Sequence, residues 1–198
     1  ARIMKEHSAT DTRVVVGLVG IQTNMFPRAR QLALEFKAQG ATVVMGGFHI
    51  SGSITMLHDE NGDSKIPCPR VMPPECAELM EQGIILFHGG AEGIWHEVLG
   101  DIVRGEAKRL YRGGRPALVT APLPEYPPDY FKGFFGRMHT LDTGRGCPFT
   151  CSFCTIINVQ GHDPRYRSVE AIVNRVRRAS VGEKRPFFFF TDDNFARN

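Results

Sequence analysis

The feature that most constrains the fold is an alternation of short apolar runs with amphipathic segments. Residues 14–19 (VVVGLV) and 41–45 (ATVVM) are rich in β-branched residues and are typical of buried strands. Between them, apolar residues at helical spacing predict a helix that ends at Gly40, where a glycine is favoured. A strand, a helix and a strand at this spacing form a βαβ unit, which implies a parallel sheet covered by helices.

The same alternation continues to about residue 114. Residues 51–70 are polar, contain Gly and Pro and show no periodic pattern, so we expect a long loop there. The next expected elements are a helix opened by Pro73 and Pro74 and closed by Gly83, a strand at 84–87, and a helix with Ile94, Val98 and Ile102 on one face. We therefore expect residues 1–114 to form a doubly wound, Rossmann-like α/β domain.

A proline-rich segment and a second α/β pattern follow. The density of prolines in residues 115–137 predicts a semi-rigid linker. Residues 138–198 then supply a strand at 138–141, a cysteine-containing loop, a helix from Val169 that Ser168 can cap, and a strand at 187–190. The predicted core face of that helix consists of Val169, Ile172, Val173 and Val176. The four consecutive phenylalanines predict a strand that is buried on both faces.

Composition excludes several classes of protein. With 42% hydrophobic and 23% charged residues the chain is an ordinary globular one, and its net charge of +3 comes from scattered basic residues. The group Arg175, Arg177 and Arg178 is expected to be a solvated helix face, so we expect no nucleic-acid partner. No apolar run approaches the roughly 20 residues that span a bilayer, and residues 1–13 lack the apolar core of a secretory signal.

The five cysteines are unevenly distributed, because three of them lie within eight positions. Such crowding without an export signal favours a metal site over disulfides, and hence a cytoplasmic location. We interpret Cys76 as a buried helix residue and Cys68 as incidental. His139 is expected to be packed or hydrogen bonded, and Arg165 and Arg167 to be surface residues that could meet a carboxylate or phosphate.

The three crowded cysteines are Cys147, Cys151 and Cys154, in the segment GRGCPFTCSFC. Thiolates are soft ligands that suit iron–sulfur clusters and zinc. An electron-transfer 4Fe–4S cluster uses four cysteines, so three would leave one iron open to a small molecule, as a catalytic metal site requires. Zinc with His162 or Cys68 as fourth ligand is the alternative, although His162 lies eight residues beyond Cys154, which matches none of the usual paired spacings.

The spacing Cys147-x3-Cys151-x-Phe153-Cys154 after a strand resembles the signature of the radical S-adenosylmethionine superfamily. The resemblance implies a (β/α)6 TIM-like barrel, of which this chain would contain the first strands and helix. It also implies a 4Fe–4S cluster whose open iron binds S-adenosylmethionine, and a 5′-deoxyadenosyl radical that removes hydrogen from a substrate. Phe153 would pack near the adenine, and a simple core aromatic is the alternative reading.

The resemblance extends to residues 191–195 (TDDNF), after the phenylalanine strand. In cobalamin-associated members a similar stretch takes the place of the motif that binds the amine of S-adenosylmethionine. The resemblance thus assigns Asp192, Asp193 and Asn194 to S-adenosylmethionine, and carboxylates there can accept hydrogen bonds from an ammonium group. An Asp-Asp turn that merely opens a loop is the alternative.

The first domain is similar to the cobalamin-binding domains that are fused to radical enzymes. Its residues 43–49 (VVMGGFH) match their Gly-Gly-x-His stretch, and residues 88–92 (HGGAE) resemble their Gly-Glu-x-Glu segment. The resemblance implies cobalamin as a further cofactor, contacted by Gly46, Gly47, His49, Gly89 and Gly90. The chain has no Asp-x-His-x-x-Gly motif, so we expect a cobalt without a protein histidine ligand.

Together these resemblances imply methyl transfer to an unactivated carbon of a small-molecule or lipid-like substrate, with an electron donor such as flavodoxin or ferredoxin. Other radical rearrangement or oxidative chemistry, and a non-catalytic cofactor- or zinc-binding module, are the alternatives. RNA methylthiolation would need three further cysteines in the first domain, where only Cys68 and Cys76 are available. Because the family barrel repeats its βα unit about six times, we expect this chain to be a fragment that is inactive alone.

Overall fold

The computed structural model describes residues 12–58, 71–127, 130–131 and 138–195. The chain divides into two compact units, Ala1–Arg115 and Pro116–Asn198. The described part of the proline-rich segment therefore belongs to the second unit from Pro116 onward. No helix among the described residues is long and apolar enough to cross a membrane.

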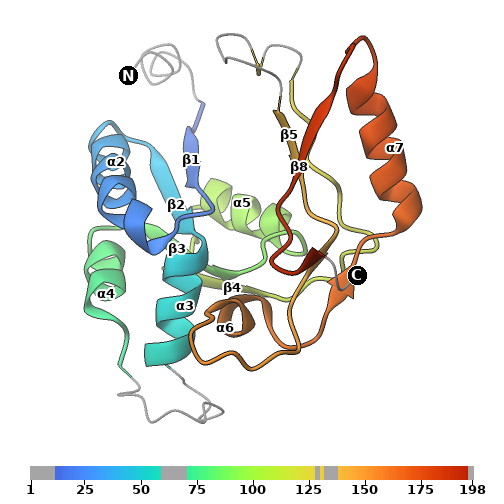
Figure 1. Cartoon of the computed structure of the whole chain (residues 1–198). Coiled ribbons are helices and arrows are strands. Elements are labelled where there is room, and N and C mark those ends of the chain that lie inside the picture. Colours follow the sequence, from blue (N-terminus) through green and yellow to red (C-terminus); the bar gives the residue numbers. More distant parts are fainter. Residues whose placement is uncertain (1–11, 59–70, 128–129, 132–137, 196–198) are drawn as a thin grey trace. The chain divides into compact units, whose positions relative to one another are not determined.

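The first unit is built on a four-stranded sheet with the order β1-β2-β3-β4, in which all neighbours are parallel (Figure 1). Its strands are β1 (Val15–Leu18), β2 (Thr42–Gly46), β3 (Ile85–Gly89) and β4 (Leu110–Gly114). Between them lie the 3-10 helix η1 (Thr23–Met25) and the helices α2 (Phe26–Ala38), α3 (Phe48–Leu57), α4 (Pro74–Glu81) and α5 (Trp95–Arg104). The predicted parallel α/β arrangement is confirmed.

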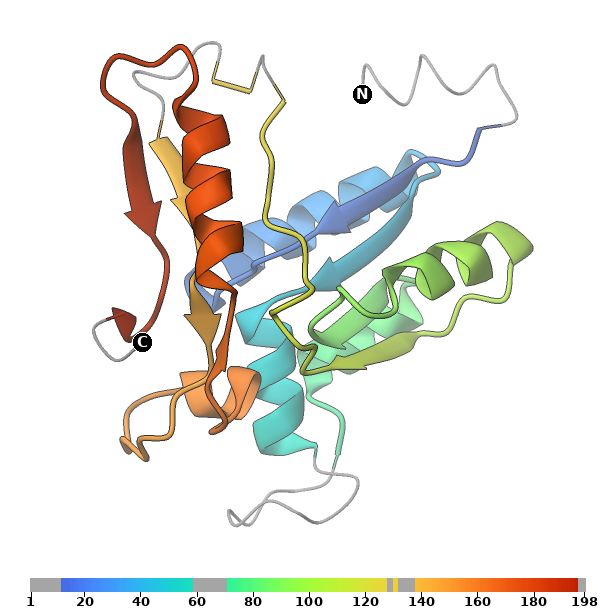
Figure 2. The same cartoon turned by 90° about the vertical axis from the view of Figure 1, so that its right-hand side faces the viewer.

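Helices cover both faces of this sheet because side chains of a strand alternate between its faces. Val43 and Met45 of β2 pack with the buried residues of α2, α3 and α4. Val44, between them in the chain, packs instead with Val98 and Ile102 of α5. Figure 2 shows these helices and the sheet from the side. The predicted doubly wound architecture is confirmed, as is the helix stop at Gly40, which has a φ of 90°.

The predicted loop over residues 51–70 is wrong in its first part, because residues 51–57 are the body of helix α3. Apart from its last two residues, the sequence FHISGSITML consists of weak helix formers, so local propensity indicates no helix there. Ile50 and Ile54 are fully buried one helical turn apart, and their burial stabilises the helix despite that propensity. Residues 59–70, which include Cys68, lie outside the described part of the chain.

The second unit contains two small sheets. Strands β5 (Met138–Leu141) and β8 (Phe187–Phe190) pair in parallel, with Leu141 opposite Phe190. Strands β6 (Gly144–Arg145) and β7 (Arg165–Tyr166) pair antiparallel. Helices α6 (Ile156–Gln160) and α7 (Val169–Ser180) lie between them in the chain, and Ser168 caps α7 by accepting a hydrogen bond from the Ala171 N–H, as predicted. The strand–helix–strand order with parallel pairing is that of a βα barrel segment.

Several burial predictions for the second unit are wrong. Strand β8 is not buried on both faces, since Phe187 and Phe189 are 58% and 53% exposed. Within the described residues β8 has a strand neighbour on one edge only, and that pairing does not cover its outer face. On α7, Val169 is 76% exposed, whereas Arg175, expected in solvent, is 5% exposed and donates to the Pro124 carbonyl.

Candidate functional site

Strands β5 and β8 bring two chemically active segments to the same edge of a sheet. They are parallel neighbours, so their carboxyl ends coincide, and the ladder continues to a hydrogen bond from Thr191 N to Leu141 O. The cysteine-containing loop follows β5, and the segment Thr191–Phe195 follows β8. Functional groups of βα barrels lie at this end of the strands.

The cysteine-containing loop is closed at its base. The Gly146 N–H donates to the Gln160 side chain at 2.9 Å, and the Cys147 N–H donates to the Gly161 carbonyl at 3.0 Å. These bonds extend the β6–β7 pair and join the residues just before Cys147 to the end of α6. We call residues 142–146, which lead into Cys147, the cysteine stem.

Gly146 is required at its position in the stem. Its φ of 92° lies in the left-handed region, and a Cβ there would stand 2.5 Å from the Asp163 carbonyl oxygen. The glycine is needed here because the chain's own backbone approaches it closely.

The three cysteines beyond the stem are free thiols. Cys147 and Cys154 are half-buried and Cys151 is exposed, while Phe153 beside them is 88% exposed. The reading of Phe153 as a core aromatic is therefore wrong. No group of three His, Cys, Asp or Glu side chains in the described part of the chain is gathered closely enough to hold a metal ion, so the structure places the thiols on one loop without drawing them together.

Asp192 is a structural anchor of the stem. Its carboxylate accepts hydrogen bonds from the Thr143 N–H at 2.9 and 3.1 Å, the Thr143 hydroxyl at 2.5 Å and the Gly144 N–H at 2.8 Å. Three donors on one carboxylate tie the end of β8 to the start of the cysteine-containing loop.

Asp193, the next residue, has a different environment. It forms no hydrogen bond to any residue that the structure describes, it is exposed, and its carboxyl lies near that of Asp192. Partial burial raises the pKa of Asp193, and the neighbouring negative charge of Asp192 raises it further. The two carboxylates of the predicted motif thus divide into one that is saturated with donors and one that is open to a cation.

In the first unit the glycine pair after β2 meets another loop of the same sheet edge. Gly47 has a φ of 136°, and a Cβ there would stand 2.2 Å from the Ile21 backbone nitrogen. The Ile21 N–H donates to the Gly46 carbonyl, and the His49 N–H donates to the Ile21 carbonyl. These glycines allow the loops after β1 and β2 to lie against each other.

The second glycine pair, Gly89 and Gly90, is also in close backbone contact. A Cβ at Gly89 would stand 2.8 Å from the Gly114 carbonyl oxygen, and the Gly90 N–H donates to that oxygen. Helix α3 contributes polar side chains here that the sequence did not indicate: Ser51 accepts from the Gly89 N–H at 3.1 Å, and Thr55 lies 2.9 Å from His88 Nε2.

His49 lies in the first turn of α3 with only 11% of its side chain exposed. Its ring packs on Phe26 with centroids 4.0 Å apart, and its Nε2 is 3.6 Å from a Glu75 carboxylate oxygen. Burial lowers the pKa of His49, an effect that Glu75 partly opposes. This Nε2 is buried and forms no hydrogen bond with the described residues.

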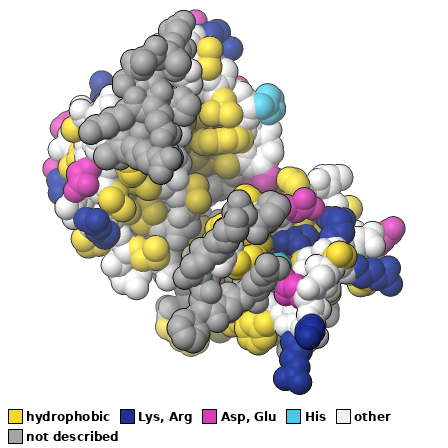
Figure 3. All heavy atoms as spheres, turned by 90° about the horizontal axis from the view of Figure 1, so that it is seen from above, with side chains coloured by type: hydrophobic (Ala, Val, Ile, Leu, Met, Phe, Trp, Pro, Cys, Tyr) yellow, Lys and Arg dark blue, Asp and Glu magenta, His cyan; other side chains and the backbone are white. Residues whose placement is uncertain are grey.

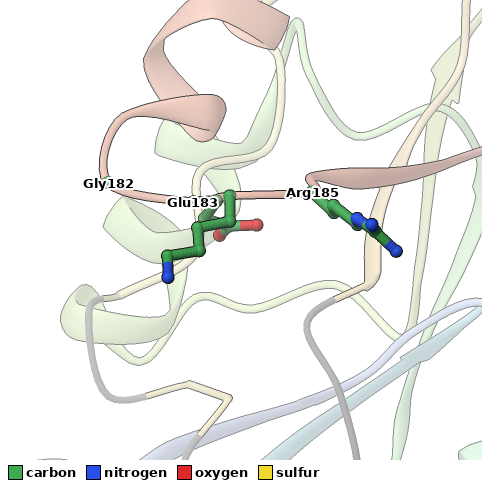
Figure 4. Close-up of a pocket in the computed structure, with 4 residues that line it drawn as sticks. Gly182, Glu183 and Arg185 are labelled. Atoms are coloured by element: carbon green, nitrogen blue, oxygen red, sulfur yellow. The ribbon is translucent and has the colours of Figure 1, made fainter.

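An open hollow at the turn between α7 and β8 lies at the other end of β8. It is lined by residues 182–185, and Figure 4 shows the side chains of Glu183 and Arg185 there. Glu183 is hydrogen bonded to buried His139 at 3.0 Å, which confirms the expectation for that histidine. Because Asp192 follows the opposite end of the strand, the hollow is separate from the candidate site.

In Figure 3 the Lys and Arg side chains on the face in view are interspersed with hydrophobic and uncharged ones.

Sequence reasoning missed the residues that build the stem. Gln160 and Thr143 act through hydrogen bonds across the chain, and neither belongs to a recognisable spacing. The β6–β7 strands are two residues each, too short for a periodic pattern.

No family model matches the sequence. Bacteriochlorophyllide d C-12(1)-methyltransferase of Chlorobaculum tepidum is 30% identical over a stretch that covers 81% of this chain and 32% of that protein. Bacteriochlorophyllide d C-8(2)-methyltransferase of the same organism is 27% identical over a stretch that covers 91% of this chain and 39% of that protein. Hopanoid C-3 methylase of Methylococcus capsulatus is 35% identical over 76 residues, covering 38% of this chain and 14% of that protein. The chain spans about a third of the length of the first two relatives.

Among solved structures, a radical S-adenosylmethionine methyltransferase, TsrM from Kitasatospora setae, has the same fold. It matches with a TM-score of 0.61 over 98% of this chain and 40% of that chain, at 17% identity. The fold has a parallel α/β unit followed in the chain by a strand–helix–strand unit of the kind that starts a βα barrel. The chain is thus similar in sequence to methyltransferases and methylases, and in fold to a radical S-adenosylmethionine methyltransferase.

Proposed function

We propose that the second unit binds a 4Fe–4S cluster through Cys147, Cys151 and Cys154 and places S-adenosylmethionine beside it. The observation that carries this proposal is the contact of Asp192 with Thr143 and Gly144, which joins the TDDNF segment to the stem of the cysteine-containing loop. The donor set fits the cofactor, since all three thiols are free and none is fully buried. A cluster held by these three thiolates would supply an open iron and the electron for cleavage of S-adenosylmethionine to methionine and a 5′-deoxyadenosyl radical.

The chain's own residues then have distinct roles. Asp192 holds the stem through its hydrogen bonds. Asp193 has no hydrogen-bond partner among the described residues, and it accepts hydrogen bonds from the ammonium group of S-adenosylmethionine. Asn194 adds an amide next to it. Phe153, 88% exposed beside Cys154, offers an aromatic face to the adenine.

The first unit is proposed to bind cobalamin at the edge where Gly46, Gly47, Gly89 and Gly90 lie. Cobalamin would supply a methyl carrier. Gly47 and Gly89 let backbone segments lie close together at this edge, and the buried Nε2 of His49 has no hydrogen-bond partner in the described residues. Residues 1–114 as the cobalamin domain, 115–137 as a linker and 138–198 as the start of the barrel remain the proposed domain boundaries.

The proposed reaction of the whole protein is methyl transfer to an unactivated carbon. The names of the relatives identify methyltransferases and methylases of bacteriochlorophyllide and hopanoids, both of which are built on large ring skeletons. We therefore propose an apolar, lipid-like small molecule as the substrate. The reducing electron would come from a low-potential donor such as flavodoxin or ferredoxin.

Anaerobic reconstitution tests the cluster. The protein is expected to turn brown and to hold about four irons and four sulfides per chain. Cys147→Ala should abolish this content, whereas Cys76→Ala, a buried cysteine on α4, should leave it unchanged. A colourless protein that retains zinc, or a cluster whose EPR spectrum does not respond to S-adenosylmethionine, would contradict the proposal.

A further inference from the structure

The proline-rich segment 116–125, which we call the proline strap, is bound to the second unit by arginines. Proline has no N–H, so a segment rich in it cannot pair as a strand, and its carbonyls need other donors. Four arginines reach the strap: one lies in β7, one directly follows β7 and two lie in α7. The bonds run from Arg165 to the Pro116 carbonyl, Arg167 to the Ala121 carbonyl, Arg175 to the Pro124 carbonyl, and Arg178 to the Glu125 carboxylate.

Two of these arginines also bind the ends of the cysteine-containing loop. Arg165 donates from Nη1 to the Pro116 carbonyl at 2.7 Å and from Nη2 to the Gln160 carbonyl at 2.9 Å. Gln160 is the residue whose side chain holds Gly146 at the base of the loop. Arg165 therefore connects the strap with the downstream end of the loop.

Arg167 makes the equivalent connection upstream. Its Nη1 donates to the Ala121 carbonyl at 2.8 Å, and its Nε and Nη2 donate to the Asp142 carboxylate at 3.1 and 2.9 Å. Asp142 opens the stem and also accepts from Arg145 at 2.9 Å. The Arg167 side chain is only 2% exposed, so this pair is shielded from water and ions. The expectation that Arg167 is a surface residue is wrong.

A guanidinium group can serve as such a bridge because its donors point in fixed, divergent directions. A lysine at either position keeps the charge but replaces the planar fork by one ammonium group, which cannot reach both partners with the same geometry. The bridges thus depend on arginine and not on positive charge alone.

We propose that Arg165 and Arg167 are positioning residues that make the proline strap part of the cysteine site. Through them the strap contacts both ends of the loop, and its placement fixes the position of the stem from which Cys147 extends. The consequence for the cluster rests on the function proposed above. The coupling between strap and stem does not, and it can be measured in the protein without iron.

Hydrogen exchange of the iron-free protein tests the coupling. Arg167→Lys and, separately, Arg165→Lys are expected to speed exchange about tenfold both at residues 117–121 and at residues 144–147, since each removes a hydrogen bond of a charged group. Arg177→Lys is the matched control, because this exposed α7 arginine has no partner among the described residues. Arg165→Lys keeps the buried Arg167–Asp142 pair, so this variant alone tests the coupling if Arg167→Lys does not fold. Faster exchange in the strap alone, with residues 144–147 as in the wild type, would overturn the proposal.

The reconstituted protein provides the second measurement. Both bridge variants should lose iron to a chelator about tenfold faster than wild type and Arg177→Lys, with an altered EPR spectrum of the reduced cluster. Equal rates and equal spectra would refute the positioning role. If the wild-type protein holds no cluster, the proposed function fails, and the exchange measurement alone decides the inference.

Discussion

The carboxylate of Asp192 accepts both the backbone N–H and the hydroxyl of Thr143, across 49 residues of sequence. This contact binds the end of β8 to the segment that leaves β5. It makes Asp192 a part of the framework, while Asp193 beside it is available to a ligand.

Asp192→Asn should destabilise the second unit. An amide keeps one acceptor oxygen but replaces the other by a donor, which faces the Thr143 and Gly144 N–H groups. We expect the free energy of unfolding of the iron-free protein to fall by about 2 kcal/mol, measured by urea denaturation. Asp193→Asn is the control, and an equal loss in both variants would contradict the division of roles.

Asp193→Asn should instead weaken S-adenosylmethionine binding by about tenfold or more, because a charged acceptor is lost. In the wild type, the raised pKa of Asp193 means that it takes up a proton at a higher pH than an ordinary aspartate. Affinity should therefore fall as the pH drops through that raised pKa, and Asp193→Asn should lack this dependence.

The pH dependence of folding stability has the opposite sign to that of S-adenosylmethionine affinity. An aspartate whose pKa is raised on folding opposes folding when it is ionised, so its unfavourable contribution is relieved as the pH falls. Asp193→Asn should consequently leave the melting temperature unchanged or raise it slightly. Titration of S-adenosylmethionine at several pH values, with melting curves alongside, measures both effects.

Gly146→Ala should prevent closure of the cysteine-containing loop. A methyl group there must displace the Asp163 backbone in addition to adopting a positive φ. Gly182→Ala is a matched control, because Gly182 has a φ of 78° but no atom within 4 Å of the added Cβ. The control should lose about 1 kcal/mol of stability and keep its cluster, whereas Gly146→Ala should lose most of its iron. Normal iron content in Gly146→Ala would show that the close approach is not needed.

Cys76 should resist alkylation in the folded protein. Burial, with a smaller contribution from Glu75, raises the pKa of Cys76 to about 12, so at pH 8 it carries almost no thiolate. Iodoacetamide at pH 8 should label Cys147, Cys151 and Cys154 of the iron-free protein and spare Cys76 until denaturant is added. Mass spectrometry of the peptides reads this directly, and early labelling of Cys76 would refute its burial.

Much of the first unit could be predicted because strand and helix periodicities are local properties of the sequence. The structure contains the strands expected from the β-branched runs around Val16 and Val43, and a helix that ends just before Gly40 as expected. Helix α3 could not be predicted, since it depends on Ile50 and Ile54 finding a buried face that only the folded sheet provides.

The sequence predicts the proposed cluster ligands of the site, but it does not predict the residues that hold the cysteine stem in place. Cysteine spacing identifies Cys147, Cys151 and Cys154 because one loop must supply them. The supports Thr143, Gln160 and Arg167 are recruited by hydrogen bonds between distant segments, and the sequence contains no periodicity that marks such bonds. Burial of Arg167 is intelligible only once its partner Asp142 is seen.

The stem before Cys147 is shaped entirely by protein groups: Asp192, Gln160 and the Gly161 carbonyl. We therefore expect the stem to keep its form in the iron-free protein. During maturation the polypeptide can fold before the iron–sulfur cluster is inserted. Iron depletion should therefore yield a folded precursor into which the cluster can be inserted later.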